Sequence, residues 1–170
     1  MKIFVLLFFL LISVYADEHR LVATGFSLHE KEYDDNGNKL HGENYGGGYE
    51  YTTFEDYGEM YFATNFSVLS DSYQNAEYTV SFSPNWRYKI SKNFDWSLGI
   101  AAFVTYKKDA YNKRPFQPDD GDYIFIPGAA PLAGLYYKDF SVNLTYIPTI
   151  SSGDVQTVGF AFVYFTWKFN

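Results

Sequence analysis

The C-terminal stretch VGFAFVYFTWKFN, residues Val158–Asn170, decides how the chain folds. Its side chains alternate between two faces with the period of two that indicates a β-strand. The face that is apolar throughout consists of Ala161, Val163, Phe165, Trp167 and Phe169. The face that becomes polar toward its end consists of Phe160, Phe162, Tyr164, Thr166 and Lys168. An apolar face for lipid and a more polar face for a lumen are typical of a transmembrane β-barrel.

Seven further segments read as strands, and helical periodicity is almost absent. With the C-terminal strand, the predicted strands are Leu21–Tyr33, Asn44–Thr53, Glu59–Leu69, Gln74–Ile90, Asp95–Lys107, Tyr123–Tyr137, Phe140–Ile147 and Val155–Phe169. Eight is an even number and the smallest usual size for such a barrel. The sequence therefore predicts an all-β fold, an eight-stranded antiparallel transmembrane β-barrel. A soluble lipocalin-like barrel or a β-sandwich is the alternative, and both usually have fewer outward aromatic side chains.

Composition supports a membrane protein and argues against other classes. Aromatic residues make up 22% of the 170 residues, including 17 Tyr and 17 Phe, which suits the aromatic belts of membrane interfaces. The net charge of −7 argues against a nucleic-acid partner. Without cysteine, an exported domain depends on its own packing or on lipid. No apolar run after residue 16 approaches the roughly 20 residues of a transmembrane helix.

The N-terminus predicts export. Lys2 precedes the apolar run Ile3–Val14, which has signal-peptide length and is too short for a membrane span. Val14-Tyr15-Ala16 resembles a cleavage site, so we expect residues 1–16 to be a signal peptide and residues 17–170 to be one barrel domain. A membrane anchor is the alternative.

Three residues with chemistry are expected at one rim of the barrel. If both termini face the periplasm, the third connection lies on the outer side with the end of the first strand. That placement brings Asp71 and Ser72 near His29. A hydroxyl, an imidazole and a carboxylate together can carry out acyl transfer, with the carboxylate orienting the imidazole. The pattern alone also arises by chance among loops, and His41 is a rival histidine.

Small residues on one face of the fifth strand leave room in the lumen. Ser97, Gly99 and Ala101 precede Phe103 on that face. An eight-stranded barrel is filled by its own side chains or holds one small ligand, so an apolar cavity here suits an acyl chain. The alternative is that these residues merely relieve crowding.

Prolines on neighbouring strands predict a lateral gap. Pro127 and Pro131 lie in the sixth strand, and Pro148 ends the seventh. Proline cannot donate to a strand ladder, and a closed barrel has no edge to accommodate it. We therefore expect a local gap between these strands, which would form a side entrance from lipid.

These features together resemble the lipid A palmitoyltransferase (PagP) family of Gram-negative outer membranes. The resemblance runs from about Phe26 to Phe169. It rests on ordered blocks: His29, Tyr33-Asp34, Gly46-Gly47-Gly48, Asp71-Ser72, Asn85-Trp86-Arg87, Asn93-Phe94 through Leu98-Gly99 to Val104-Thr105, Ile126-Pro127 with Pro131-Leu132-Ala133, and Thr145-Tyr146-Ile147-Pro148.

The resemblance implies an outer-membrane acyltransferase. Such an enzyme moves a palmitoyl chain from the sn-1 position of a glycerophospholipid donor to a lipid A acceptor, which aids resistance to cationic antimicrobial peptides. The family's essential residues match His29, Asp71 and Ser72, without assigning Ser72 as the nucleophile. The family has no metal or organic cofactor, so we expect none here, and we expect a monomer among outer-membrane lipids. A non-catalytic barrel that stabilises the membrane or binds a surface partner is the alternative function.

The sequence departs from the family in three places. The amphipathic helix before the first strand is missing or reduced. Prolines that flank a second lateral opening, between the first two strands, are replaced by Thr24 and Asn44. The glycine that sets the cavity floor falls near Ser81 or Ser83, so we expect the acyl-chain pocket to include Ser81, Ser83, Gly99 and Ala101.

Overall fold

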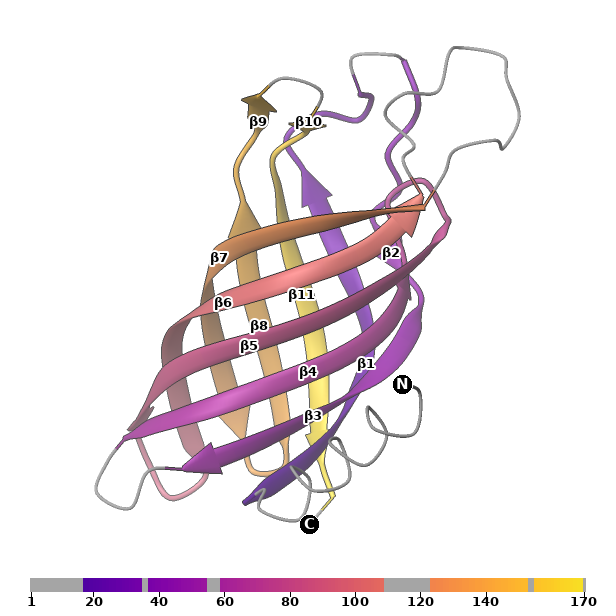
Figure 1. Ribbon diagram of the computed structural model, residues 1–170. Coiled ribbons are helices and arrows are strands. Elements are labelled where there is room, and N and C mark those ends of the chain that lie inside the picture. The colour runs from indigo at the N-terminus through magenta and orange to yellow at the C-terminus, as the bar shows by residue number, and fades with distance from the viewer. Residues whose placement is uncertain (1–16, 35–36, 55–58, 109–122, 153–154, 170) are drawn as a thin grey trace.

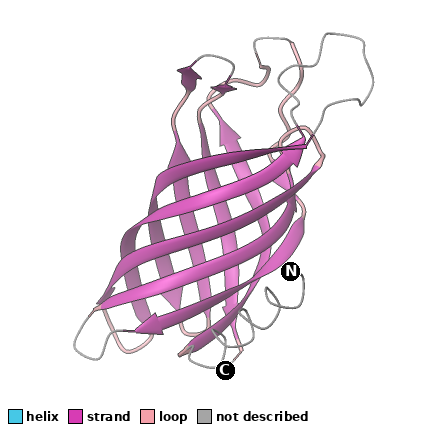
Figure 2. Cartoon of the chain, viewed as in Figure 1, coloured by secondary structure: helices cyan, strands magenta, loops and turns pink. Residues whose placement is uncertain are grey.

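The strands of the chain wind around a common axis as a single barrel (Figure 1). The structure is a computed structural model that describes residues 17–34, 37–54, 59–108, 123–152 and 155–169. The strands are β1 (Glu18–His29), β2 (Glu43–Asn44), β3 (Gly46–Phe54), β4 (Met60–Ser70), β5 (Ala76–Lys89), β6 (Phe94–Lys108), β7 (Tyr123–Tyr137), β8 (Phe140–Ile147), β9 (Ile150–Ser152), β10 (Val155–Thr157) and β11 (Phe160–Lys168). Within these ranges every regular element is a strand, and none is a helix (Figure 2).

The barrel closes between its first and last strands. Neighbours pair antiparallel in the order β11-β8-β7-β6-β5-β4-β3-β1-β2, and β11 also pairs with β1. The closing ladder runs from Arg20 opposite Lys168 to His29 opposite Phe160, with a bulge between Ala23 and Gly25. Short β2 continues β3 after Tyr45, so the two together act as one barrel strand and the barrel has eight. The predicted eight-stranded antiparallel barrel is confirmed.

Two strand boundaries differ from the sequence prediction. The first strand ends at His29 rather than Tyr33, because Tyr33 pairs with Lys39 inside its own loop. The last predicted strand is divided: β10 pairs with β9 in a separate hairpin, and β11 begins only after Gly159. The predicted signal peptide and most of the long connection after Lys108 lie outside the described residues.

Side chains alternate between a lipid-facing exterior and a lumen. On β5, Val80, Phe82 and Trp86 are exposed, whereas Ser83 and Asn85 are buried. The same alternation on β11 exposes Phe165 and Trp167 and buries Thr166, as the C-terminal pattern predicts. Soluble monomers rarely expose so continuous an apolar surface, and an outward apolar band is what a transmembrane barrel needs.

Among the described residues, no helix is both long enough and apolar enough to cross a bilayer.

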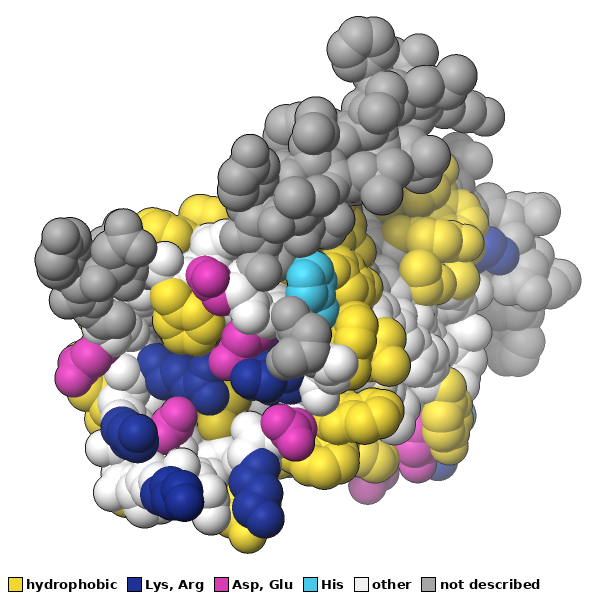
Figure 3. Space-filling model, turned by 90° about the horizontal axis from the view of Figure 1, so that it is seen from below, with side chains coloured by type: hydrophobic (Ala, Val, Ile, Leu, Met, Phe, Trp, Pro, Cys, Tyr) yellow, Lys and Arg dark blue, Asp and Glu magenta, His cyan; other side chains and the backbone are white. Residues whose placement is uncertain are grey.

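A network of ion-paired side chains fills the lower half of the lumen. Arg20, which is 1% exposed, donates from Nη2 to Oε2 of Glu18 at 2.7 Å. The other oxygen of Glu18 lies 3.3 Å from Arg87 and 3.5 Å from Lys168. Seen from below, basic and acidic side chains gather at this end of the barrel (Figure 3). Buried charges persist only when they are paired and hydrogen-bonded, and this network provides both.

The seam expected to open laterally differs from the seam whose flanking prolines are replaced. The ladder between β7 and β8 runs from Tyr137 opposite Phe140 only to Leu132 opposite Thr145. Residues 123–131 of β7 form no ladder pair with β8 within the described chain, and Pro127 and Pro131 lie in this stretch. At its lower end the hydroxyl of Thr145 on β8 donates to the carbonyl of Pro131 at 2.8 Å. Beside it β8 ends at Ile147, directly before Pro148. A gap in the ladder therefore lies where the prolines predict one.

The seam between β1 and β2 is closed instead. Gly25 pairs with Asn44 and Phe26 pairs with Glu43 across it. The hydroxyl of Thr24 also donates to the backbone carbonyl of Asn44 at 2.7 Å. The two residues at the positions of the family's prolines thus bond to each other, through a Thr24 hydroxyl that proline would lack.

Candidate active site

Two of the three predicted catalytic residues are in direct contact at the upper rim. His29 is the last residue of β1, and Ser72 lies in the turn after β4. Nε2 of His29 lies 2.7 Å from Oγ of Ser72. The imidazole also packs beside the ring of Phe160, with 5.7 Å between the ring centroids. An imidazole that hydrogen-bonds a hydroxyl in this way can exchange a proton with it or with a bound hydroxyl nearby.

Asp71 holds the turn that presents Ser72. Its Oδ1 accepts hydrogen bonds from the backbone N–H groups of Tyr73, at 3.0 Å, and Asn75, at 2.8 Å. The backbone N–H of Asp71 donates to the carbonyl of Asn75, which closes the same turn. The expected hydrogen bond by which a carboxylate orients the imidazole is not formed between Asp71 and His29: Oδ1 accepts from the two turn N–H groups, and the hydrogen-bond partner of the imidazole is Ser72.

The second carboxylate oxygen of Asp71 is available to a ligand. Asp71 is 3% exposed, and its Oδ2 has no hydrogen-bond partner among the described residues. Asp71 and Ser72 both line the upper cavity of the barrel. Leaving a buried acceptor unpaired costs free energy, so the position favours a ligand that donates to it.

The rival histidine contributes its backbone rather than its ring. The backbone N–H of His41 donates to the carbonyl of Ser72 at 2.8 Å. This bond docks the loop after β1 onto the turn after β4. Among the described contacts, His29 is therefore the histidine whose ring reaches Ser72.

A buried polar group below the rim connects three strands. The hydroxyl of Ser27 on β1 donates to Oδ1 of Asn44 at 2.7 Å. Nδ2 of Asn44 donates in turn to the carbonyl of Ser70 at 2.8 Å. The sequence predicted Asn44 as a strand residue that replaces a proline of the family, and it did not predict a role for Ser27. Their inward positions on predicted strands were the available signal.

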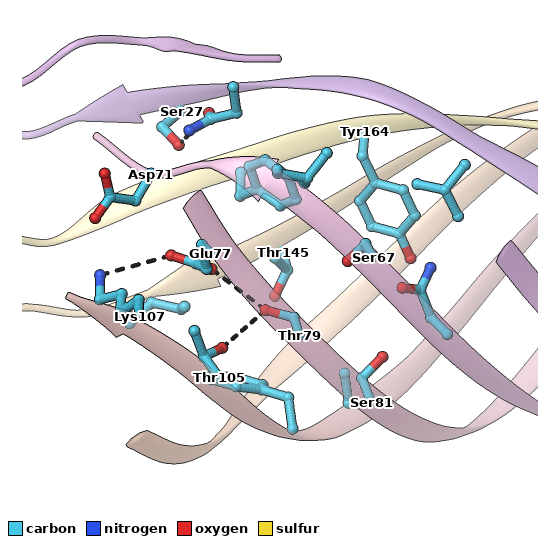
Figure 4. Close-up of a pocket in the computed structure, with 18 of the residues that line it drawn as sticks. Ser27, Ser67, Asp71, Glu77, Thr79, Ser81, Thr105, Lys107, Thr145 and Tyr164 are labelled. Carbon is cyan, nitrogen blue, oxygen red and sulfur yellow. Dashed lines mark hydrogen bonds and ion pairs between the residues drawn. The ribbon is translucent and has the colours of Figure 1, made fainter. Parts of the chain in front are cut away.

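A cavity of about 1040 Å³, partly open to solvent, occupies the upper lumen (Figure 4). Phe103, Leu132, Ile147, Phe160 and Phe162 supply apolar lining. Of the predicted pocket residues, Ser81, Ser83 and Ala101 line the cavity. Gly99 is not among its lining residues.

Asn85 closes the lumen beneath these serines. It is fully buried, and its Nδ2 donates to Oγ of Ser83 at 2.9 Å. A Cβ added to Gly99 would lie 2.1 Å from Oδ1 of Asn85, so Asn85 already fills the space that a side chain at this position would need. The small residue at Gly99 therefore relieves crowding, whereas Ala101, two residues higher, borders open space.

An aromatic ring narrows the cavity at the level of Ser81. Phe103 lies opposite Ser81 on one side and opposite Gly128 on the other. A Cβ added to Gly128 would lie 2.4 Å from Cζ of Phe103, so the ring occupies the space that a larger residue there would need. Gly128 lies in the stretch of β7 that forms no ladder pair with β8. Alternation along the strand predicts Phe103 on the lumen face but does not predict this contact.

A clamp at the upper rim holds the end of β8. The hydroxyl of Tyr146 donates to Oε1 of Glu30 at 2.5 Å, and the hydroxyl of Thr149 donates to Oε2 at 3.0 Å. These two hydrogen bonds stabilise the carboxylate and lower the pKa of Glu30 below its usual range.

Within the described residues, no group of three or more His, Cys, Asp or Glu side chains could hold a metal ion.

Comparison with known proteins identifies one family. The sequence profile described as "Antimicrobial peptide resistance and lipid A acylation protein PagP" matches residues 13–167. A protein named "Lipid A acyltransferase PagP" from Legionella longbeachae is 35% identical over 82 residues, which is 48% of this chain and 31% of the relative. The protein of the same name from Serratia proteamaculans is 31% identical over 105 residues, or 60% of this chain and 45% of the relative. Each match thus spans less than half of the relative's own length.

Among solved structures, the outer membrane protein Ail of Yersinia pestis in a phospholipid bilayer nanodisc is similar to the chain. The match has 18% sequence identity and a TM-score of 0.45, and it covers 89% of this chain and 99% of that one.

Proposed function

The chain belongs to the family of the antimicrobial peptide resistance and lipid A acylation protein PagP, and we propose that it is an outer-membrane acyltransferase. It transfers a palmitoyl or similar chain from the sn-1 position of a glycerophospholipid to lipid A. The observation that carries the proposal is the 2.7 Å contact between His29 and Ser72, the latter lining the mouth of a deep cavity.

The reaction exchanges one ester for another. The lipid A hydroxyl oxygen attacks the sn-1 carbonyl carbon, the bond from that carbon to the glycerol oxygen breaks, and a lysophospholipid leaves. His29 accepts the proton of the attacking hydroxyl and returns it to the departing glycerol oxygen. Ser72 hydrogen-bonds the imidazole and holds it at the cavity mouth. This scheme is balanced without an acyl-enzyme, so Ser72 is not assigned as the nucleophile.

Asp71 has a positioning role in this scheme. Its Oδ1 fixes the turn that carries Ser72, and its buried Oδ2 has no hydrogen-bond partner among the described residues.

The donor chain enters from lipid through the gap between β7 and β8 and descends into the cavity. Pro127, Pro131 and Pro148 mark this gap, and Leu132 and Thr145, where the ladder resumes, line the cavity. Ser81, Ser83 and Ala101 border the space for the chain. We propose further that the protein is a monomer, that residues 1–16 direct its export, and that lipid A acylation contributes resistance to cationic antimicrobial peptides.

Mass spectrometry of lipid A tests the function. Gram-negative cells that express the chain are expected to gain lipid A heavier by one palmitoyl group, and cells that express Ser72→Ala are expected to lack it while the barrel still folds. Lipid A of unchanged mass in cells with folded wild-type protein would instead favour a non-catalytic barrel.

A further inference from the structure

An ion pair at the mouth of the cavity has no role in the acyl transfer described above. Lys107 near the end of β6 and Glu77 near the start of β5 lie opposite each other in the ladder. Nζ of Lys107 is 3.6 Å from Oε2 of Glu77. Both residues line the cavity, and Figure 4 shows them on the same side as Asp71. Lys107 is the one basic residue among the described residues that line this cavity.

The pair is loose enough to open. Its two side chains are 29% and 27% exposed, and the separation is longer than a good charged hydrogen bond. Partly exposed ion pairs of this kind contribute little to stability. Glu77 has another partner, because its Oε1 accepts a hydrogen bond from Thr79 at 3.3 Å. Thr79 Oγ1 in turn lies 2.9 Å from the hydroxyl oxygen of Thr105, so the position of Glu77 does not depend on Lys107 alone.

A second feature of the mouth points to a ligand. Oδ2 of Asp71 is buried and unpartnered, and Asp71 lines the same cavity. Two independent features, a weakly paired ammonium and an unpaired buried carboxylate oxygen, therefore occur together at one opening. They match a ligand that has both an anionic group and a hydrogen-bond donor nearby.

We propose that Lys107 binds the phosphodiester group of the donor phospholipid and that Glu77 holds its ammonium in place when no donor is bound. The inference rests on the proposed function, since it takes the cavity to hold the donor's acyl chain. With that chain in the lumen, the glycerol and its phosphate stay at the mouth, where Lys107 lies. A lysine ammonium acts as a point charge, so it suits a phosphate that can approach from several directions.

Binding of non-hydrolysable lipids tests this without requiring catalysis. Detergent-solubilised wild type and Lys107→Gln are titrated with a diether phosphatidylglycerol and with an uncharged dialkylglycerol of the same chains. We expect Lys107→Gln to raise the Kd of the phosphate lipid about tenfold, equal to about 1.4 kcal/mol, and to leave the uncharged lipid unchanged. The matched control is Lys108→Gln, since Lys108 is the next residue on β6 and does not line the cavity.

Glu77→Gln gives a change of opposite sign. Removing the competing carboxylate is expected to lower the Kd of the phosphate lipid about threefold, because exposed ion pairs are worth up to roughly 1 kcal/mol. Equal weakening of both lipids by Lys107→Gln would overturn the proposal, as it would assign Lys107 to packing. In a third titration, with lipid A, weakened binding of lipid A alone would overturn it too, by assigning Lys107 to an acceptor phosphate. A chain that binds the diether lipid through Lys107 but transfers no acyl group would refute the proposed function and support this site.

Discussion

The same strands surround both halves of the lumen, but the upper half holds a cavity and the lower half is filled by charged side chains. Above, Ser81, Ser83 and Ala101 point inward and leave a cavity. Below, Arg20 and Arg87 fill the lumen with ion pairs to Glu18. The alternation of inward and outward side chains is the same in both halves, so the difference lies in side-chain volume and charge. Small and hydroxyl-bearing residues leave room for a substrate, whereas long paired cations stabilise the barrel.

The largest expected effect is a loss of activity in the upper half without a loss of stability in the lower half. His29→Ala removes the group proposed to move the proton, so acyl transfer should fall by about 10²–10⁴. Unfolding in urea should be unaffected, since the ring lies at the rim. His41→Ala is the matched control, because only its backbone contacts Ser72 in the described structure. Near-normal transfer by His29→Ala in detergent micelles would exclude this assignment.

The next largest effect is a loss of stability when the ion-pair network of the lower half is disrupted. Arg20→Met leaves Glu18 without its two hydrogen bonds from the guanidinium, at 3.0 and 2.7 Å. Removing one partner of a buried pair costs about 3–5 kcal/mol, and the remaining contacts of Glu18 place the expected loss at about 3 kcal/mol. The free energy of unfolding in urea measures it. Lys168→Met is the control, with an expected loss below about 1 kcal/mol, because Lys168 is partly exposed. Equal losses for both variants would contradict the buried network.

Filling the base of the cavity sharpens the boundary between the halves. Ser83→Met adds heavy atoms directly above Asn85, where close packing cannot yield without cost. The preferred donor should become shorter, because each methylene contributes roughly 0.8 kcal/mol only where it has room. Phosphatidylcholines of graded sn-1 length measure the preference, with Ser81→Met as the parallel variant one level higher. Unchanged selectivity in both folded, active variants would show that the floor lies elsewhere.

A subtler change narrows the cavity from its wall. Gly128→Val requires the ring of Phe103 to move, because a Cβ at this position would lie 2.4 Å from Cζ. We expect the ring to shift into the cavity and the preference for donor length to shorten. Adding Phe103→Ala to Gly128→Val should restore longer chains, since the two changes compensate in volume. If the double variant kept the preference of Gly128→Val alone, the ring would not be the cause.

The sequence predicted the features that depend on pattern and missed those that depend on contact. Alternation along 158–170 indicated the barrel. Pro127 and Pro131 indicated the gap, because a proline cannot donate to the strand ladder whatever its surroundings. It did not predict that Oδ1 of Asp71 is taken by the N–H groups of Tyr73 and Asn75, because that depends on the conformation of the turn. Lys107 was missed because a lysine near the end of a strand usually faces solvent.

The smallest effect concerns the clamp at the upper rim, where the end of β8 depends on exposed hydrogen bonds rather than on buried ion pairs. The carboxylate of Glu30 accepts hydroxyl hydrogens from Tyr146 and Thr149, which lowers its pKa. A group with a depressed pKa in the folded state stabilises above its ordinary pKa, 4.5, and the contribution is lost as pH falls through the lower folded value. The backbone N–H of Gly159 donates to the Thr149 hydroxyl at 2.7 Å, so it reports on the clamp. Glu30→Gln should therefore reduce protection of the Gly159 amide in hydrogen exchange at pH 7, and wild type should approach the variant in strong acid. Global unfolding should hardly change, because the clamp is exposed. Equal protection of wild type and Glu30→Gln at pH 7 would show that the carboxylate charge does not hold this rim.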